Sequence, residues 1–135
     1  CMWGVCAGAI LMAERVENPA QRSFGLVPLT VRRNAYGRQI ESFIAPLLLR
    51  LPGQAPQELD AVFIRAPRIA QADNGCTVLA EQNAFTVLAE HDGSPVALQH
   101  GFHLITTFHP ELSHSVALHR HFALLCSAKQ ERRLA

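Results

Sequence analysis

The sequence predicts an α/β domain in three layers, with helices packed against a sheet. A short apolar run, Met2-Trp3, leads into a turn with two glycines at residues 4–8 (GVCAG), and residues 9–13 then have helical spacing. This order is typical of a strand, a sharp turn and a helix. Further β-like runs follow along the chain, and helical spacing returns after Ser113.

Composition indicates one globular domain, residues 1–135, and argues against two classes of partner. Apolar residues make up 49% of the chain and charged residues 17%, a balance typical of a folded protein. The formal net charge of +1 provides no basic field for nucleic acid or an anionic membrane. The longest apolar run, residues 5–13, is shorter than the roughly 20 residues that a membrane span needs.

The first half is predicted to contain one helix and three strands. The helix runs from Ala7 to about Val16 and ends at Asn18-Pro19. Residues 46–56 contain three prolines and one glycine, which favours a loop. The remaining segments are a loop at 21–25, strands at 26–33, 39–44 and 60–65, and a connection at 34–37.

The second half is predicted to add antiparallel strands and a closing helix. Thr77–Glu81 (TVLAE) recurs as residues 86–90, a local duplication that is too short for a solenoid. Strands are expected at 86–90, 95–100 and 102–108, with turns at Asp92-Gly93 and near Gly101. A helix is expected after Ser113, which with Ser115 is a candidate cap; its apolar face holds Val116, Leu118, Phe122, Leu125 and Cys126.

Cys6 lies at the corner between the first strand and the first helix. Glycines two residues before and two after it would let the backbone pack tightly at a strained turn, as in a nucleophile elbow. A thiol over a helix N-terminus is expected to have a lowered pKa. The alternative is a structural cysteine beside a Gly-rich turn, because G-x-C-x-G is a loose pattern.

A second stretch, residues 107–112 (TFHPEL), supplies what a nucleophilic cysteine needs. His109 and Glu111 follow a β-like run, and Pro110 stiffens the backbone between them. A histidine can take the thiol proton, and a carboxylate can fix its tautomer and stabilise the imidazolium. The order Cys, His, Glu is that of the class I glutamine amidotransferase triad.

Four segments together carry a family resemblance. In one order the chain has GVCAG at 4–8, VRRNAYGRQ at 31–39, FIRAP at 63–67 and FHPEL at 108–112. This series resembles the glutaminase subunit family of pyridoxal 5′-phosphate synthases, from Trp3 to about Phe122. The resemblance implies a flavodoxin-like α/β/α domain that here lacks its N-terminal portion, because nothing matches the family's leading strands and Gly-Gly-Glu-Ser-like loop.

The resemblance also implies a reaction, a partner and a set of site residues. The expected reaction is hydrolysis of L-glutamine to L-glutamate and ammonia, with no metal or organic cofactor. The ammonia would pass to a separate synthase subunit in a hetero-oligomer that builds pyridoxal 5′-phosphate. The matching residues are Cys6, His109 and Glu111 as the triad, Ala7 as an oxyanion donor, and Arg33, Ile64 and Arg65 as glutamine ligands.

Two other functions stay open at this point. The chain could serve a different synthase, or it could be an inactive fragment or interaction module, and Arg33 could be a solvated strand-end residue. Because family members take a second oxyanion donor from the unmatched leading loop, we expect residues 1–135 alone not to be a competent glutaminase.

The remaining cysteines and histidines predict no metal site. Cys1, Cys6, Cys76 and Cys126 lack the paired spacing of a zinc site, and a nucleophilic Cys6 has to stay free, which favours a reducing cytoplasm. The other histidines are expected at strand ends, on the surface or in packing roles: His91, His100, His103, His114, His119 and His121.

Overall fold

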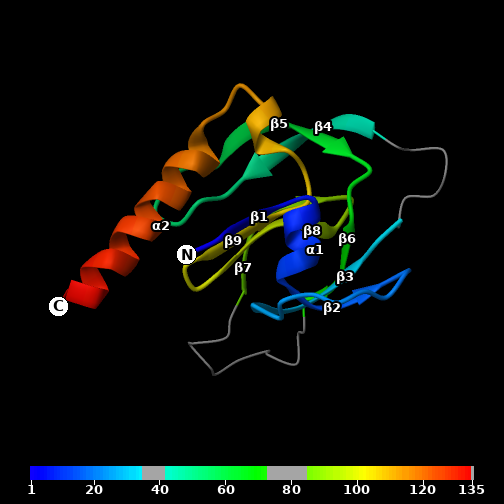
Figure 1. The fold of residues 1–135 in the computed structure, drawn as a ribbon. Coiled ribbons are helices and arrows are strands. Elements are labelled where there is room, and N and C mark those ends of the chain that lie inside the picture. The colour runs from blue at the N-terminus through cyan, green and yellow to red at the C-terminus, as the bar shows by residue number, and fades with distance from the viewer. Residues whose placement is uncertain (35–41, 73–84, 135) are drawn as a thin grey trace.

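A four-stranded sheet lies at the centre of the computed structural model, which describes residues 1–34, 42–72 and 85–134. Its strands are, in spatial order, β1 (Trp3–Val5), β9 (His103–Thr106), β8 (Ser94–His100) and β7 (Phe85–His91). β1 runs parallel to β9, and β8 is antiparallel to β9 and β7. The parallel pair brings the first strand beside the last one, which places the residues after β1 beside those after β9 (Figure 1).

Two smaller sheets flank this one (Figure 1). In the first, β2 (Ala13–Glu17) is parallel to β3 (Val27–Arg32), and β3 is antiparallel to β6 (Arg68–Ala72). The second is the antiparallel pair β4 (Ser42–Leu49) and β5 (Gln57–Ile64). The helices are α1 (Ala7–Met12), the 3-10 turn η2 (Pro110–Leu112) and α2 (Ala117–Leu134).

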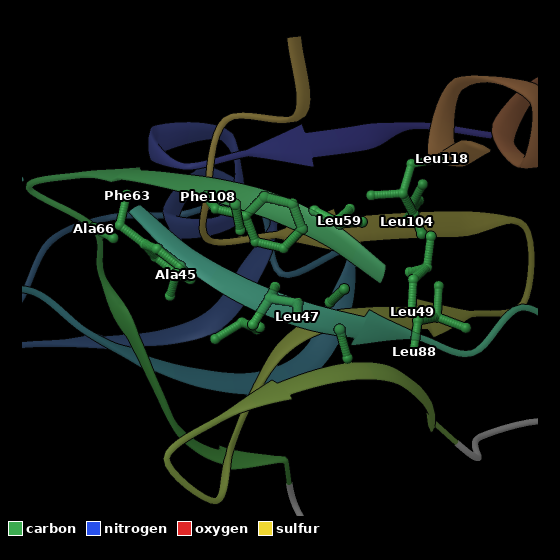
Figure 2. Close-up of a cluster of buried hydrophobic side chains, with 14 of the residues drawn as sticks. Ala45, Leu47, Leu49, Leu59, Phe63, Ala66, Leu88, Leu104, Phe108 and Leu118 are labelled. Carbon is green, nitrogen blue, oxygen red and sulfur yellow. The ribbon is translucent and has the colours of Figure 1, made fainter. Parts of the chain in front are cut away.

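Both faces of the central sheet are covered, so the domain has three layers as predicted. Successive residues of a strand point to opposite faces, and Leu104 and Ile105 on β9 accordingly belong to different buried clusters. Leu104 packs with β4, β5 and Leu118 of α2 (Figure 2). Ile105 packs with α1 and the β2–β3–β6 sheet. One outer layer is therefore largely a β-hairpin, where a flavodoxin-like α/β/α domain would have helices.

The first helix is shorter than predicted. It ends at Met12, and Ala13–Glu17 forms β2 beside β3. Ala13 and Val16 are buried in the same cluster as Val27 and Val31. A spacing of three residues favours a helix, and the strand accommodates it through a register shift between Ala13 and Arg15. Residues 13–17 are extended because they pair with the distant strand β3. The sequence of these residues does not by itself indicate a strand.

The prediction of a loop over residues 46–56 was also wrong for residues 46–49. β4 continues to Leu49 and includes Pro46, opposite Asp60 of β5. Ala45, Leu47 and Leu49 are buried, whereas Pro46 and Leu48 face outward. Proline is accepted because this sheet has two strands, so its missing N–H can lie on an unpaired edge. β5 begins at Gln57, and β6 was not predicted.

The hairpins of the second half confirm the turn chemistry. Asp92 and Gly93 have φ of 49° and 75° and form the two-residue loop between β7 and β8. Gly101, at φ 57°, begins the next turn, and His100 pairs with His103 across it. The second copy of the duplicated segment lies in β7, whereas Thr77–Glu81 and the 35–41 part of the connection and strand lie outside the described residues.

The closing helix is present and packs by most of the predicted face. Leu118 is buried, Phe122, Leu125 and Cys126 are half-buried, and Val116 is exposed ahead of the helix. His121, which was not assigned to this face, is buried as well. The Ala117 N–H lies 3.3 Å from Ser115 Oγ, as expected for a cap. None of the helices in the described ranges is long and apolar enough to cross a membrane.

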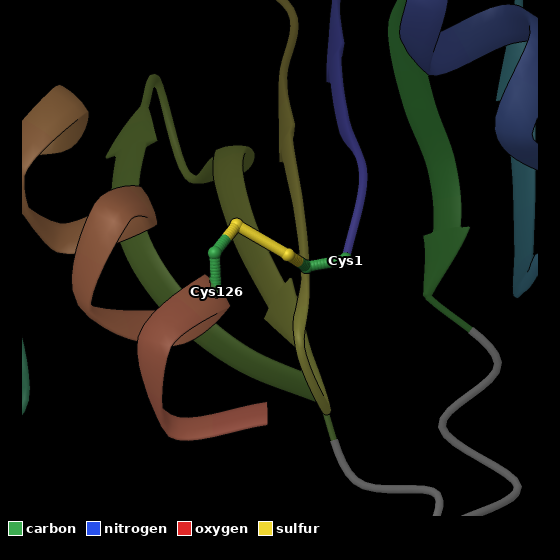
Figure 3. The surroundings of a disulfide bond; sticks show 2 residues. All are labelled: Cys1 and Cys126. Atoms are coloured by element: carbon green, nitrogen blue, oxygen red, sulfur yellow. A yellow bond between two sulfur atoms is a disulfide. The ribbon is translucent and has the colours of Figure 1, made fainter. Parts of the chain in front are cut away.

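A disulfide joins Cys1 to Cys126, and so links the residue ahead of β1 to the middle of α2 (Figure 3). This bond was not expected, because the sequence favoured a reducing compartment, where cysteines stay as free thiols. The sequence could not identify the pair, since the two cysteines are 125 residues apart and meet only through the β1–β9 pairing and the packing of α2. Cys6 is free, as predicted, and Cys76 lies outside the described residues.

Candidate active site

Cys6 occupies a strained corner between β1 and α1. Its φ is 51° and its ψ −103°, on the left-handed side that non-glycine residues rarely adopt. The Cys6 N–H donates to the Thr106 carbonyl at 2.8 Å, and its own carbonyl accepts from Ala9 N at 3.0 Å. Strand and helix thus hold the corner from both sides, which matches the predicted elbow.

The two glycines around Cys6 are not equivalent. A Cβ on Gly4 would lie 2.7 Å from the Gly8 backbone and from Met12 Sδ, so only glycine allows α1 to approach β1 this closely. A Cβ on Gly8 would meet nothing within 4 Å. The prediction that both glycines permit tight packing therefore holds for Gly4, while Gly8 contributes its backbone as the surface against which Gly4 packs.

The pKa of the Cys6 thiol is raised, which corrects the expectation of a lowered one. Burial of the half-buried thiol is the main cause, and the negative charge of Glu111 adds to it. The Ala7 N–H, at the start of α1, opposes these two by hydrogen bonding the sulfur. With six residues, α1 supplies too small a dipole to reverse the balance. The free protein therefore holds Cys6 mainly as a thiol.

His109 and Glu111 form a close pair on the segment that follows β9. His109 Nδ1 lies 2.6 Å from Glu111 Oε1, and the His109 N–H donates to the Val62 carbonyl of β5 at 2.9 Å. His109 precedes η2, where Pro110 fixes the turn that brings the carboxylate back to the ring. With Nδ1–H donating to Glu111, the other ring nitrogen, Nε2, is left to exchange a proton.

The pKa of Glu111 is lowered. Burial acts to raise it, but hydrogen bonds from its own backbone N–H and from His109, together with the histidine charge, outweigh that effect. Glu111 is consequently a carboxylate at neutral pH and can fix the tautomer of His109.

A pocket of about 330 Å³ gathers most of the predicted site residues beside the thiol. This volume is in the range of small-molecule sites. Cys6, Ala7, Arg33, Ile64 and Arg65 all line it, and they come from the elbow and from the ends of β3 and β5. The lining also includes three residues that were not singled out: Ile10, Asn34 and Pro67. Asn34 and Pro67 lie within the matched segments and could have been found there.

His109 and Glu111 do not line this pocket. Besides accepting from the Ala7 N–H, Cys6 Sγ donates to the Ile64 carbonyl at 3.7 Å, and the described residues show no hydrogen bond between Cys6 and His109. Glu111 is near enough for its charge to affect the thiol. Contacts between a nucleophile and its base are often loose without substrate.

The two arginines at the pocket reach it from tight turns. Arg65 has a φ of 46°, directly after β5, and its side chain is exposed. Arg33 follows β3, its N–H donates to the Glu17 carbonyl at 2.9 Å, and its Nη1 donates to Gln21 Oε1 at 2.6 Å. Two arginines that line the same pocket as a thiol suit a substrate that carries a carboxylate.

The remaining histidines lie where they were expected, at strand ends (His91, His100 and His103), on the surface (His114 and His119) or in packing (His121). The described residues contain no cluster suited to a metal. His121 is 7% exposed, and its Nε2 lies 2.7 Å from Gln99 Oε1. His119 packs edge-on against Trp3. Burial lowers the pKa of His100, His103 and His121. The His121–Gln99 pair joins α2 to β8, whereas His100 packs against Phe85 of β7.

The three-layer fold and the cysteine elbow beside a two-arginine pocket define the class of protein, a glutamine amidotransferase. A solved structure described as a glutamine amidotransferase has a TM-score of 0.74 and 37% sequence identity, over 93% of this chain and 60% of that one. Residues 1–127 match the SNO glutamine amidotransferase family, and the chain belongs to that family.

Several relatives carry the name pyridoxal 5′-phosphate synthase subunit PdxT. This chain is 48% identical to the one from Solibacter usitatus over 124 residues, 90% of this chain and 60% of that protein. It is 47% identical to the one from Koribacter versatilis over 120 residues, 89% of this chain and 56% of that protein. The chain thus spans less than two thirds of these relatives.

Proposed function

We propose that the protein to which this chain belongs hydrolyses L-glutamine to L-glutamate and ammonia, and that it supplies the ammonia to a pyridoxal 5′-phosphate synthase subunit. The observation that carries the reaction is the left-handed Cys6, free and half-buried, beside a pocket with two arginines. The family and the names of the relatives support the biosynthetic role and the partner.

In the proposed mechanism, His109 removes the proton of Cys6 and the sulfur attacks the side-chain amide carbon of glutamine. The carbonyl becomes an oxyanion, which the Ala7 N–H can stabilise because it already lies against the sulfur. His109 then protonates the departing ammonia, leaving a γ-glutamyl thioester. Water activated by His109 cleaves the thioester and restores the thiol.

The raised pKa of Cys6 fits a mechanism in which the base acts when substrate is bound. A resting thiol does not react with other electrophiles, whereas a substrate that fills the pocket excludes water and draws His109 and Cys6 together. Glu111 would hold the His109 ring in the required orientation and stabilise its charged form, as their 2.6 Å contact supports.

The arginines are proposed to bind the α-carboxylate of glutamine. Arg33 and Arg65 line the same pocket as Ile64. The Ile64 carbonyl accepts a hydrogen bond from the thiol in the free protein, and it can accept one from the amino group or the amide of the substrate. A substrate anchored by its carboxylate at one end would place its amide at Cys6. The pocket volume of about 330 Å³ is sufficient for one amino acid.

We also propose the cytoplasm as the compartment, because a working Cys6 has to remain reduced. The Cys1–Cys126 disulfide is the observation that opposes this assignment. Non-reducing peptide mapping of the native protein decides: a linked Cys1–Cys126 peptide in freshly isolated protein would contradict a reducing compartment.

The reaction is tested by measuring ammonia release from L-glutamine with the full-length protein, with and without the synthase subunit. Cys6→Ala and His109→Asn should each lower turnover about a thousandfold or more, since members of a catalytic unit fail together. His114→Asn is the matched control, because His114 is exposed and lies outside the pair. Turnover that survives Cys6→Ala would refute the mechanism.

A further inference from the structure

Two adjacent arginines at the end of β3 have partners of different charge. Arg32 Nη2 donates to Glu17 Oε2 at 3.3 Å, so its charge is balanced by a carboxylate. Arg33 Nη1 donates instead to the neutral Gln21 Oε1, at 2.6 Å. Within the described ranges, no carboxylate lies at ion-pair distance from Arg33. The positive charge of Arg33 is therefore held in place without being neutralised.

The backbone around Arg33 is fixed by the same segment that carries Gln21. Besides the Arg33 N–H bond to Glu17, Asn18 Nδ2 donates to the Arg33 carbonyl at 3.2 Å. Asn34 Nδ2 donates back to the Asn18 carbonyl at 3.3 Å. Residues 17–21 thus contact Arg33 both at its backbone and at its guanidinium.

Gln21 acts from outside the pocket. Arg33 lines the pocket together with Cys6 and Arg65, whereas Gln21 is exposed and is not part of the lining. A neutral amide oxygen occupies one guanidinium N–H and leaves the others, with the full charge, for a ligand. A carboxylate in its place would pair with the guanidinium and compete with an anionic ligand.

We propose that Gln21 is a positioning residue, which aims the Arg33 guanidinium at the pocket and keeps it charged for the carboxylate of the substrate. This inference rests on the proposed function, in which that carboxylate is the α-carboxylate of glutamine. It assigns substrate affinity, and not the chemical step, to a residue outside the matched motifs.

The test compares L-glutamine with L-glutaminamide, whose α-carboxylate is replaced by an amide, in the full-length protein. Gln21→Ala should raise the KM for L-glutamine about three- to tenfold, the effect of one hydrogen bond, with kcat changed less than about twofold. Gln21→Glu should raise this KM at least as much, because it neutralises Arg33. The KM for L-glutaminamide should stay the same in both variants.

Glu17→Gln is the matched control, since it removes a charge from the same segment. The Glu17 carboxylate contacts Arg15 and Arg32, and not the side chain of Arg33. It should leave the KM for L-glutamine unchanged. An unchanged KM in both Gln21 variants overturns the proposal. An equal rise for L-glutamine and L-glutaminamide also overturns it, because that pattern indicates a merely structural role.

Calorimetry with L-glutamate, which carries the same α-carboxylate, separates this inference from the reaction. If the wild-type protein releases no ammonia but binds L-glutamate more tightly than Gln21→Ala does, the positioning role stands and the proposed reaction fails. Binding that is absent, or equal in the two proteins, refutes the positioning role.

Discussion

The contact between Gly4 and α1 predicts opposite effects for alanine at the two glycines that flank Cys6. In Gly4→Ala, the new methyl group would lie 2.7 Å from the Gly8 carbonyl carbon and oxygen and from Met12 Sδ. The methionine side chain can move aside, but the Gly8 backbone is part of α1 and cannot move without the helix. In Gly8→Ala, the methyl group meets nothing within 4 Å and replaces a glycine inside a helix.

The size of each effect follows from these distances. To restore an ordinary carbon contact, α1 has to move away from β1 by about 0.7 Å, a case of overpacking that costs about 1–3 kcal/mol of unfolding free energy. Cys6 begins α1 and would move with it, and a displacement of this order lowers turnover by about a hundredfold. Gly8→Ala should raise the unfolding free energy by up to about 1 kcal/mol.

Urea unfolding of the full-length protein, followed by circular dichroism, measures both changes, and ammonia release reports on the position of Cys6. We expect Gly4→Ala to be less stable and poorly active, and Gly8→Ala to be as stable as the wild type or more so. If Gly8→Ala were the more damaging of the two, the assignment of the close contact to the Gly4 side would be wrong.

Three further predictions concern charge and strain. Cys6→Gly should be inactive yet about 1 kcal/mol more stable than Cys6→Ala in urea, because glycine adopts φ 51° without strain; equal stability would contradict a strained corner. Iodoacetamide should label Cys6 with a pH midpoint above that of an unperturbed cysteine, since burial and the Glu111 charge raise its pKa, and a midpoint below that of an unperturbed cysteine would refute that account. Burial lowers the pKa of His100, His103 and His121, so below about pH 6.5 the unfolded chain takes up protons that the folded chain does not. Stability should therefore fall between pH 7.5 and 5.5, and an unfolding free energy that is flat over this range would show that these histidines stay accessible to protons.

The features that the sequence determined depend on residues close together in the chain. The strand–turn–helix corner at Cys6 follows from glycine and helical spacing within nine residues, and the Asp92-Gly93 hairpin from the one turn type that two such residues favour. His109 and Glu111 are two residues apart with a proline between them, so their pairing at 2.6 Å was also within reach of local reasoning. The residues of the pocket, apart from Ile10, were predictable as a set because each lies in a segment of the family pattern, although their catalytic and binding roles stay predictions.

Tertiary structure decided the features that depend on distant segments. Residues 13–17 became a strand because β3 offers them hydrogen-bond partners, and Pro46 could stay in β4 because that sheet leaves an edge unpaired. The pKa of Cys6 is set by burial and by a carboxylate 105 positions away in the chain, which outweigh the short helix that favoured a thiolate. Arg32 and Arg33 are the same residue type side by side, and only their packing against residues 17–21 gives one a carboxylate and the other an amide. Local spacing and glycines set turns and short helices, whereas strand pairing, burial and charge pairing arise when remote segments meet.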